Sequence, residues 1–206
     1  MTGYNVPAGY GEAEYIEKRS RFIGRVWHIE DEAEALSHIK EMRKIHWDAA
    51  HNVYAYSIRD GNIARFSDDS EPSGTAGMPV LEVLRRNEIC NFCCVVTRYF
   101  GGVLLGAGGL IRAYAHSAKI ALDAAGTAVV SRWVIGTLSC GYPMLERLKI
   151  AVSEHCGTVR SIDYGADVVI EALFPEERVQ AFSEAVIDLT GGKTQFQESG
   201  EEQVCG

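Results

Sequence analysis

The sequence lacks a long apolar run, a secretory leader pattern and a regular cysteine framework. No stretch of about 18 apolar residues occurs in the 206-residue chain, which argues against a membrane-spanning helix. The opening MTGYNVPAGYGEAEY has neither the basic nor the apolar segment of a secretory signal. The six cysteines are irregularly spaced, and Cys93 and Cys94 lie in the apolar run FCCVV. We therefore expect a cytoplasmic protein with reduced thiols, at least one of these two being buried.

An excess of positive charge is also missing. The net charge of −8 disfavours general binding to polyanions. Residues 1–130 carry 14 basic and 16 acidic side chains, whereas residues 131–206 carry 6 and 12. A nucleic-acid surface would therefore be a local patch in the first part, where KRSRFIGR at residues 18–25 concentrates basic side chains. The acidic second part is a candidate surface for contacts with another protein.

Complete catalytic and nucleotide-binding motifs are absent as well. Gly101 and Gly106 have the spacing of a Walker A loop, but alanine and glycine follow Gly106 where lysine and a hydroxyl residue belong. The third glycine of a Rossmann motif is replaced by Ile111. No local Ser-His-Asp or Cys-His signature occurs, so no catalytic residue is assigned.

The patterns that are present predict an α+β protein with two domains, residues 1–130 and 131–206. In the first domain, we expect strands at residues 19–29, 50–58, 62–69 and 91–100 and helices at 31–46, 78–87 and 110–126. Asp31 is expected to cap the first helix, and Asp60-Gly61 to turn a hairpin. The expected inner face of the last helix consists of Leu110, Ala113, Tyr114, Ser117, Ala118, Ala121 and Leu122.

The second domain has the element order β-α-β-β-α-β of a ferredoxin-like fold. The expected strands are residues 132–140, 158–165, 166–174 and 193–199, and the expected helices are 143–156 and 175–190. Pro175 is expected to open the second helix, and Gly191-Gly192 to close it. The tail EEQVCG is expected to be loose. This fold supports many functions and indicates none.

The stretch RYFGGVLLGAGGLIRAY, residues 98–114, is a candidate anion-binding loop. Five glycines within nine positions indicate that the backbone turns sharply or lies close to another group. Because the stretch precedes a helix, unpaired N–H groups and the helix dipole would attract an anion there. The candidate ligands are Arg98, Gly101, Gly102, Gly106, Gly108, Gly109 and Arg112. A tight connection flanked by two surface arginines explains the same residues, and the spacing favours neither alternative.

The stretch FSDDSEPSGTAGMP, residues 66–79, is a second candidate loop. Ser73, Gly74 and Thr75 would precede a helix and could face the glycine-rich loop. Asp68, Asp69 and Glu71 are carboxylates of the kind that holds magnesium. A solvated turn with side-chain caps is the alternative that these residues favour, so we predict no cofactor and no firm metal site.

Two further patterns resemble metal or redox sites without matching one. HWDAAH places His46, Asp48 and His51 close together, but the spacing fits neither a zinc-protease helix nor a zinc finger. Cys90 and Cys93 have the spacing of a redox pair, but they lead into a buried strand rather than open a helix, where a reactive thiol would be favoured. The spacing therefore disfavours a metal site at HWDAAH, and we reject the cysteine pair as a thioredoxin-like site.

Four stretches together resemble the signature of the IMPACT family, in its bacterial YigZ branch. They are KRSRFI, DAAHNVYAY, RFSDDSEPSGTAGMP and VVTRYFGGVLLGAGGLIRAY, within residues 18–125. The resemblance implies a first domain with the fold of a small-subunit ribosomal protein and of domain IV of elongation factor G. It implies a second domain similar to domain V of that factor. Eukaryotic relatives are translational regulators that bind a partner of the amino-acid-starvation kinase pathway.

Residues and resemblance together favour a non-enzymatic, translation-associated protein. Its expected partner is RNA, the ribosome or a translation-related protein, bound through the first domain. The alternative is an enzyme or sensor that binds a small phosphorylated ligand at the two loops. A closed pocket between the loops would favour the small ligand, whereas an open basic strip would favour RNA.

Overall fold

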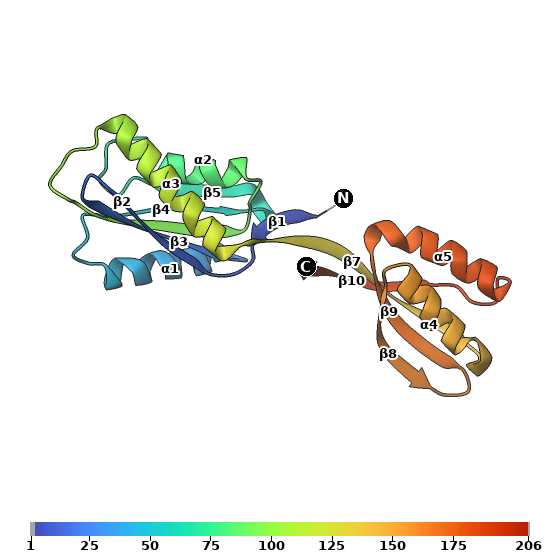
Figure 1. Cartoon of the computed structure of the whole chain (residues 1–206). Helices are drawn as coiled ribbons and strands as arrows, with labels where there is room; N and C mark the ends of the chain where they lie inside the picture. The colour runs from blue at the N-terminus through green and yellow to red at the C-terminus, as the bar shows by residue number, and fades with distance from the viewer. Residues whose placement is uncertain (1–2, 206) are drawn as a thin grey trace. The chain divides into compact units, whose positions relative to one another are not determined.

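The computed structural model describes residues 3–205, which divide into two compact units. The first unit is residues 4–129, and the second contains the chain from Val130 onward. Both units combine helices with strands (Figure 1), which confirms the α+β class. Within the described residues, no helix is both long enough and apolar enough to cross a membrane.

The first unit is built around a five-stranded antiparallel sheet. Its elements are β1 Tyr4–Pro7, β2 Gly11–Glu17, β3 Ser20–His28, α1 Glu32–Ile45, β4 His51–Ile58, η1 Asp60–Asn62, β5 Ile63–Ser67, α2 Gly77–Arg86, β6 Phe92–Tyr99 and α3 Ala107–Ala125. The strand order is β2-β3-β6-β4-β5. β6 is central and almost entirely buried, as a strand that is apolar on both faces should be. The hairpin expected at Asp60-Gly61 is confirmed between β4 and β5.

Helices cover both faces of this sheet, with α2 and α3 on one side and α1 on the other (Figure 1). All seven residues expected on the inner face of α3 are buried. The approach is close enough that a Cβ atom added at Gly24 of β3 would lie 2.3 Å from the carbonyl oxygen of Ser117. The Asp31 carboxylate accepts a hydrogen bond from the Glu34 amide at 2.9 Å, which confirms the predicted cap of α1.

The second unit has the predicted β-α-β-β-α-β order. Its elements are β7 Thr127–Cys140, which begins in the first unit, η2 Tyr142–Met144, α4 Leu145–Glu154, β8 Thr158–Tyr164, β9 Val168–Pro175, α5 Glu176–Thr190 and β10 Gln197–Cys205. The sheet has the order β10-β7-β9-β8 with antiparallel neighbours, and β1 also pairs with β7. Pro175 precedes α5 and Gly191 ends it in a left-handed conformation, as predicted. α4 and α5 pack on one face of the sheet.

Three predictions about strands were wrong. β1 and β2 were not predicted, and β7 starts five residues before the expected strand. β10 starts at Gln197 rather than at residue 193, and it includes residues 201–205 of the tail that was expected to be loose. β2 and β10 have sequences rich in glutamate, GEAEYIE and QESGEEQVC, and lie largely exposed at or near the edges of their sheets. The sequences of these strands show little apolar alternation, so the pattern does not predict them. They are held by backbone pairing rather than by burial of side chains.

The close packing of α3 on β3 can be tested with Gly24→Ala. The new methyl group must displace the Ser117 carbonyl, so we expect a loss of about 1–3 kcal/mol in the free energy of unfolding. Gly9→Ala is the matched control, because a Cβ atom at Gly9 meets nothing within 4 Å. Urea unfolding of both variants measures the difference, and equal stabilities would contradict this packing.

Thiol accessibility provides a second test of the fold. Cys93 and Cys94 are free and buried, as predicted, whereas Cys156 and Cys205 are free and exposed. Burial raises the pKa of Cys93 to about 12, so almost no thiolate forms there at pH 8. We expect a thiol reagent at pH 8 to modify Cys156 and Cys205 within minutes, and Cys93 and Cys94 only after unfolding. Mass-spectrometric mapping measures this order, and early labelling of Cys93 would contradict it.

Candidate functional site at one end of the first sheet

Four segments that are separate in sequence meet at one end of the first sheet. The start of β3 and the start of β4 both lie opposite the end of β6, and the last residue of β5, Ser67, pairs with Tyr54 in the middle of β4. The segments that leave or enter these strand ends are residues 18–20, 46–50, 67–76 and 100–106. We call this region the loop end. It contains most of the residues that the sequence indicated as functional.

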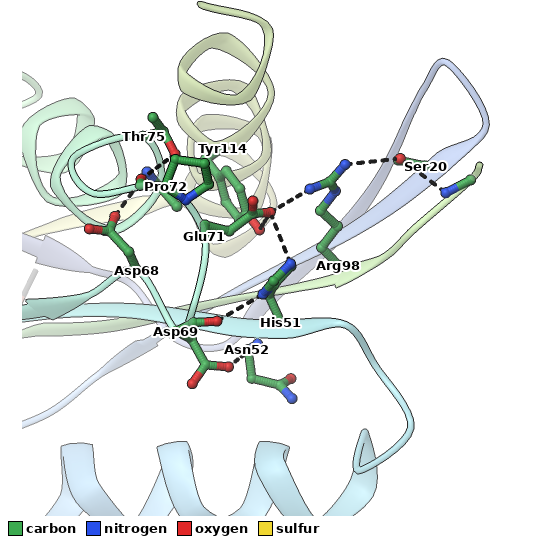
Figure 2. Close-up of polar contacts among 12 residues, drawn as sticks. Ser20, His51, Asn52, Asp68, Asp69, Glu71, Pro72, Thr75, Arg98 and Tyr114 are labelled. Carbon is green, nitrogen blue, oxygen red and sulfur yellow. Dashed lines mark hydrogen bonds and ion pairs between the residues drawn. The ribbon is translucent and has the colours of Figure 1, made fainter. Parts of the chain in front are cut away.

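The centre of the loop end is the buried carboxylate of Glu71. Its Oε1 atom accepts hydrogen bonds from Arg98 Nη1 at 2.5 Å and from the Tyr114 hydroxyl at 2.8 Å, and His51 Nε2 lies 3.6 Å away (Figure 2). The side chains of Glu71 and Arg98 are only 4% and 6% exposed. Burial and the negative charge of Glu71 raise the pKa of Tyr114 well above its usual value. Tyr114 therefore acts as a neutral donor to Glu71.

Arg98 is engaged inside the protein. Its Nη2 atom lies 3.4 Å from Ser20 Oγ, which also accepts a hydrogen bond from the Gly101 amide at 3.2 Å. The guanidinium lies 5.4 Å from the ring centre of Phe22 and 5.6 Å from that of Phe100. Its buried Nε atom has no hydrogen-bond partner among the described residues. The sequence predicted Arg98 as a ligand of a bound anion. In the structure its guanidinium instead pairs with the carboxylate of Glu71.

Asp68 organises the backbone of the loop that precedes α2. Its carboxylate accepts hydrogen bonds from the amides of Gly74, Ala76 and Gly77 at 2.8–3.0 Å. It therefore caps α2, whose first residues have no capping side chain at Ala76. The Thr75 hydroxyl donates to the carbonyl of Pro72 at 2.6 Å, and Ser73 is exposed.

Asp69 joins this loop to the opposite face of the sheet. Its carboxylate accepts from the Asn52 amide at 2.7 Å and from Arg43 Nη2 at 3.0 Å, and its carbonyl oxygen lies 2.8 Å from His51 Nδ1. The three acidic residues considered for magnesium thus have separate protein partners. No group of three or more His, Cys, Asp or Glu side chains within residues 3–205 is arranged to hold a metal ion.

The glycines of the glycine-rich stretch at residues 98–114 are required for different structural reasons. A Cβ atom at Gly101 would lie 2.0 Å from the backbone of Arg19, so glycine permits a close approach of two loops. Gly102 and Gly106 have φ angles of 81° and 72°, in the left-handed region that favours glycine. Gly108 and Gly109 lie in the first turn of α3 and have no such angle. Much of the glycine content is therefore explained by the backbone path.

Lys18 and Arg112 line a small hollow beside the first turn of α3. The hollow has a volume of about 90 Å³. Its lining consists of Tyr15, Glu17, Lys18, Leu105, Gly109, Arg112 and Ala113. Lys18, Arg19 and Arg112 are exposed, and none of them has an ion-pair partner in the part of the chain that the structure describes. Of the predicted anion ligands with a charge, only Arg112 presents that charge to solvent.

The HWDAAH residues separate into two hydrogen-bonded groups. His46 Nδ1 lies 2.8 Å from the Tyr99 hydroxyl, which donates to Asp48 Oδ1 at 3.2 Å. Because that hydroxyl proton is used by Asp48, the proton on His46 Nδ1 is the one shared with Tyr99. Burial, with Arg25 nearby, lowers the pKa of His46, so the ring is neutral near pH 7. His51 belongs instead to the Glu71 cluster.

Comparisons with known proteins identify the family of this chain. The Impact N-terminal domain family matches residues 18–122, which include the whole loop end. The chain is 40% identical over 189 residues to the IMPACT family member YvyE of Bacillus subtilis, covering 91% of this chain and 87% of that protein. The chain belongs to the IMPACT family.

Other matches extend this relationship over the second unit. The IMPACT family member YigZ of Escherichia coli is 34% identical over 199 residues, covering 95% of this chain and 98% of that protein. Residues 138–193 match the family described as Domain of unknown function (DUF1949). A crystal structure described only as that of a hypothetical protein is 32% identical, with a TM-score of 0.61, and the match covers 97% of this chain and 98% of that one. The resemblance to the IMPACT family stated from the sequence is thus confirmed.

The sequence did not indicate Ser20, His51 and Tyr114 as members of the Glu71 cluster. Tyr114 was expected only to be buried, yet a buried tyrosine hydroxyl needs a hydrogen-bond partner. This need for a hydrogen-bond partner was the one indication in the sequence that a polar group lies beneath α3. Nothing in the spacing identified which of the three neighbouring acids would meet it.

The Glu71–Arg98 pair can be tested with Glu71→Gln. Removing the charge leaves a buried guanidinium without its counter-ion, so we expect a loss of about 3–5 kcal/mol in the free energy of unfolding. The matched control is Glu14→Gln, which breaks an exposed pair with Arg21 and should cost less than about 1 kcal/mol.

Urea unfolding measures both losses. The double variant Glu71→Gln/Arg98→Met removes the unpaired charge and should recover part of the stability lost in Glu71→Gln. Similar small losses for Glu71→Gln and Glu14→Gln would show that the buried pair has no special role.

Proposed function

We propose that this IMPACT family member is a cytoplasmic, translation-associated protein that binds RNA or the ribosome through its loop end. The observation that carries the proposal is the group of three exposed basic side chains, Lys18, Arg19 and Arg112, without ion-pair partners among residues 3–205. Such side chains attract phosphates, and these three lie together at the loop end of a chain whose net charge is −8.

The hollow between Lys18 and Arg112 supports contact with a phosphate. It lies at Gly109 in the first turn of α3, where backbone N–H groups and the helix dipole favour negative charge. Gly106, as the residue before α3, offers no side chain that competes for these N–H groups. Lys18 and Arg112 would thus contact one phosphate group from two sides.

The size of the hollow favours RNA over a small phosphorylated ligand. Small-molecule sites usually have volumes of about 300–1,000 Å³, whereas this hollow has about 90 Å³. It suits a single phosphate group whose remaining chain stays in solvent. A nucleotide bound at Arg112 would need a larger space than this hollow provides.

The proposal predicts that Arg112→Ala weakens binding without unfolding the protein. Affinity for ribosomes or for a structured RNA should fall at about 0.1 M salt, and the slope of log affinity against log salt should become shallower by roughly one unit. The control is Arg178→Ala, which removes an exposed arginine from a helix of the second unit.

Co-sedimentation or fluorescence anisotropy at several salt concentrations measures these effects, with a thermal melt of each variant. Equal losses for Arg112→Ala and Arg178→Ala would indicate non-specific attraction. Calorimetric titration with nucleotides tests the alternative, because micromolar affinity for one of them would favour the sensor or enzyme.

A further inference from the structure

Trp47, in the segment that connects α1 to β4, is 81% exposed. The chain's other two tryptophans are more protected, since Trp27 stacks on His38 and the Trp133 indole N–H donates to Ser131. An indole left in water forgoes a large hydrophobic gain, which makes its exposure informative. Trp47 also lies in HWDAAH, whose His46, Asp48 and His51 form no metal site in the structure.

The backbone around Trp47 is held in place from both sides. His46 and Asp48, its two neighbours, are both bonded to the hydroxyl of Tyr99 at the end of β6. The carbonyl of His46 accepts a further hydrogen bond from Asn52 at 3.1 Å, and the amide of Ala49 donates to it at 3.1 Å. An exposed aromatic ring on a fixed backbone loses little freedom when a partner covers it.

Asp48 beside Trp47 is exposed, but exposed positive charge on α1 and in the turn at residues 18–19 favours a nucleic acid as that partner. Lys44 in the last turn of α1 is exposed and has no ion-pair partner among the described residues, and the basic turn at residues 18–19 lies at the same loop end. Nucleobases stack on exposed aromatic rings while nearby cations contact the phosphates. A protein partner would instead use the exposed apolar neighbour Ile45 together with the indole.

We propose that Trp47 is a stacking platform for an unpaired base of single-stranded RNA, a preference that rests on the proposed RNA-binding function. The ring supplies the contact with the base, and Lys44 and the basic turn contact the flanking phosphates. Fully paired RNA keeps its bases inside the helix and offers Trp47 no free ring face along its length. The loop end therefore distinguishes unpaired from paired segments.

The experiment compares a single-stranded oligonucleotide of about 12 nucleotides with a blunt duplex of equal phosphate number, using the full chain. Trp47→Ala should weaken binding of the single strand roughly 5- to 150-fold and leave the salt slope unchanged. Trp47→Phe should retain most of the affinity. Ile45→Ala and Leu104→Ala are the controls, since both side chains are apolar and exposed, Leu104 at 83%. Neither control should weaken binding.

Each outcome decides between the proposals. If Trp47→Ala binds the single strand as the wild type does while Arg112→Ala binds weakly, RNA binding stands and stacking is overturned. If Ile45→Ala is as damaging as Trp47→Ala, the oligonucleotide gains from apolar contact in general and not from stacking on the indole, and stacking is also overturned. If the wild type binds neither oligonucleotide nor ribosomes, the proposed function fails and the platform fails with it. Thermal melts confirm that each variant is folded.

Discussion

The loop end of the first unit depends on one buried ion pair, between Glu71 and Arg98. Both side chains are almost fully removed from water, which costs several kcal/mol for each charge unless hydrogen bonds replace the lost hydration. Tyr114 and Ser20 supply some of those bonds, so the loop before α2, the helix α3 and the start of β3 are held at the end of β6. If any of these elements moved away, a buried charge would be left unsatisfied. The pair therefore ties the positions of these elements to one another.

The two arginines beside the glycine-rich stretch look alike in the sequence but differ in the structure. Arg98 and Arg112 flank the same glycine-rich stretch, yet Arg98 is neutralised inside the protein and Arg112 is exposed without an ion-pair partner in the described chain. The acids divide in the same way, since Asp68 caps backbone amides, Asp69 bonds Asn52 and Arg43, and Glu71 holds the guanidinium. An anion at the loop end would therefore meet only charges that lie outside the buried cluster.

Elements with strong local patterns were predictable, and contacts between distant segments were not. The inner face of α3, the cap at Asp31 and the Asp60-Gly61 hairpin follow from periodicity and turn chemistry, which act within a few residues. The polar strands β2 and β10 were missed because they are stabilised mainly by pairing with their neighbours. Which acid meets Arg98 was also hidden, because it depends on how the loop before α2 folds back over the sheet.

The end of β6 explains why two different surfaces are found together. Arg98 and Tyr99 are adjacent, so their side chains point to opposite faces of the sheet. Arg98 holds the Glu71 cluster on the side of α2 and α3, whereas Tyr99 bonds His46 and Asp48 and so fixes the backbone of Trp47. Gly101, two residues further along, allows Arg19 to approach and brings the basic turn to the same strand end. One strand end thus positions both the basic turn and the exposed indole.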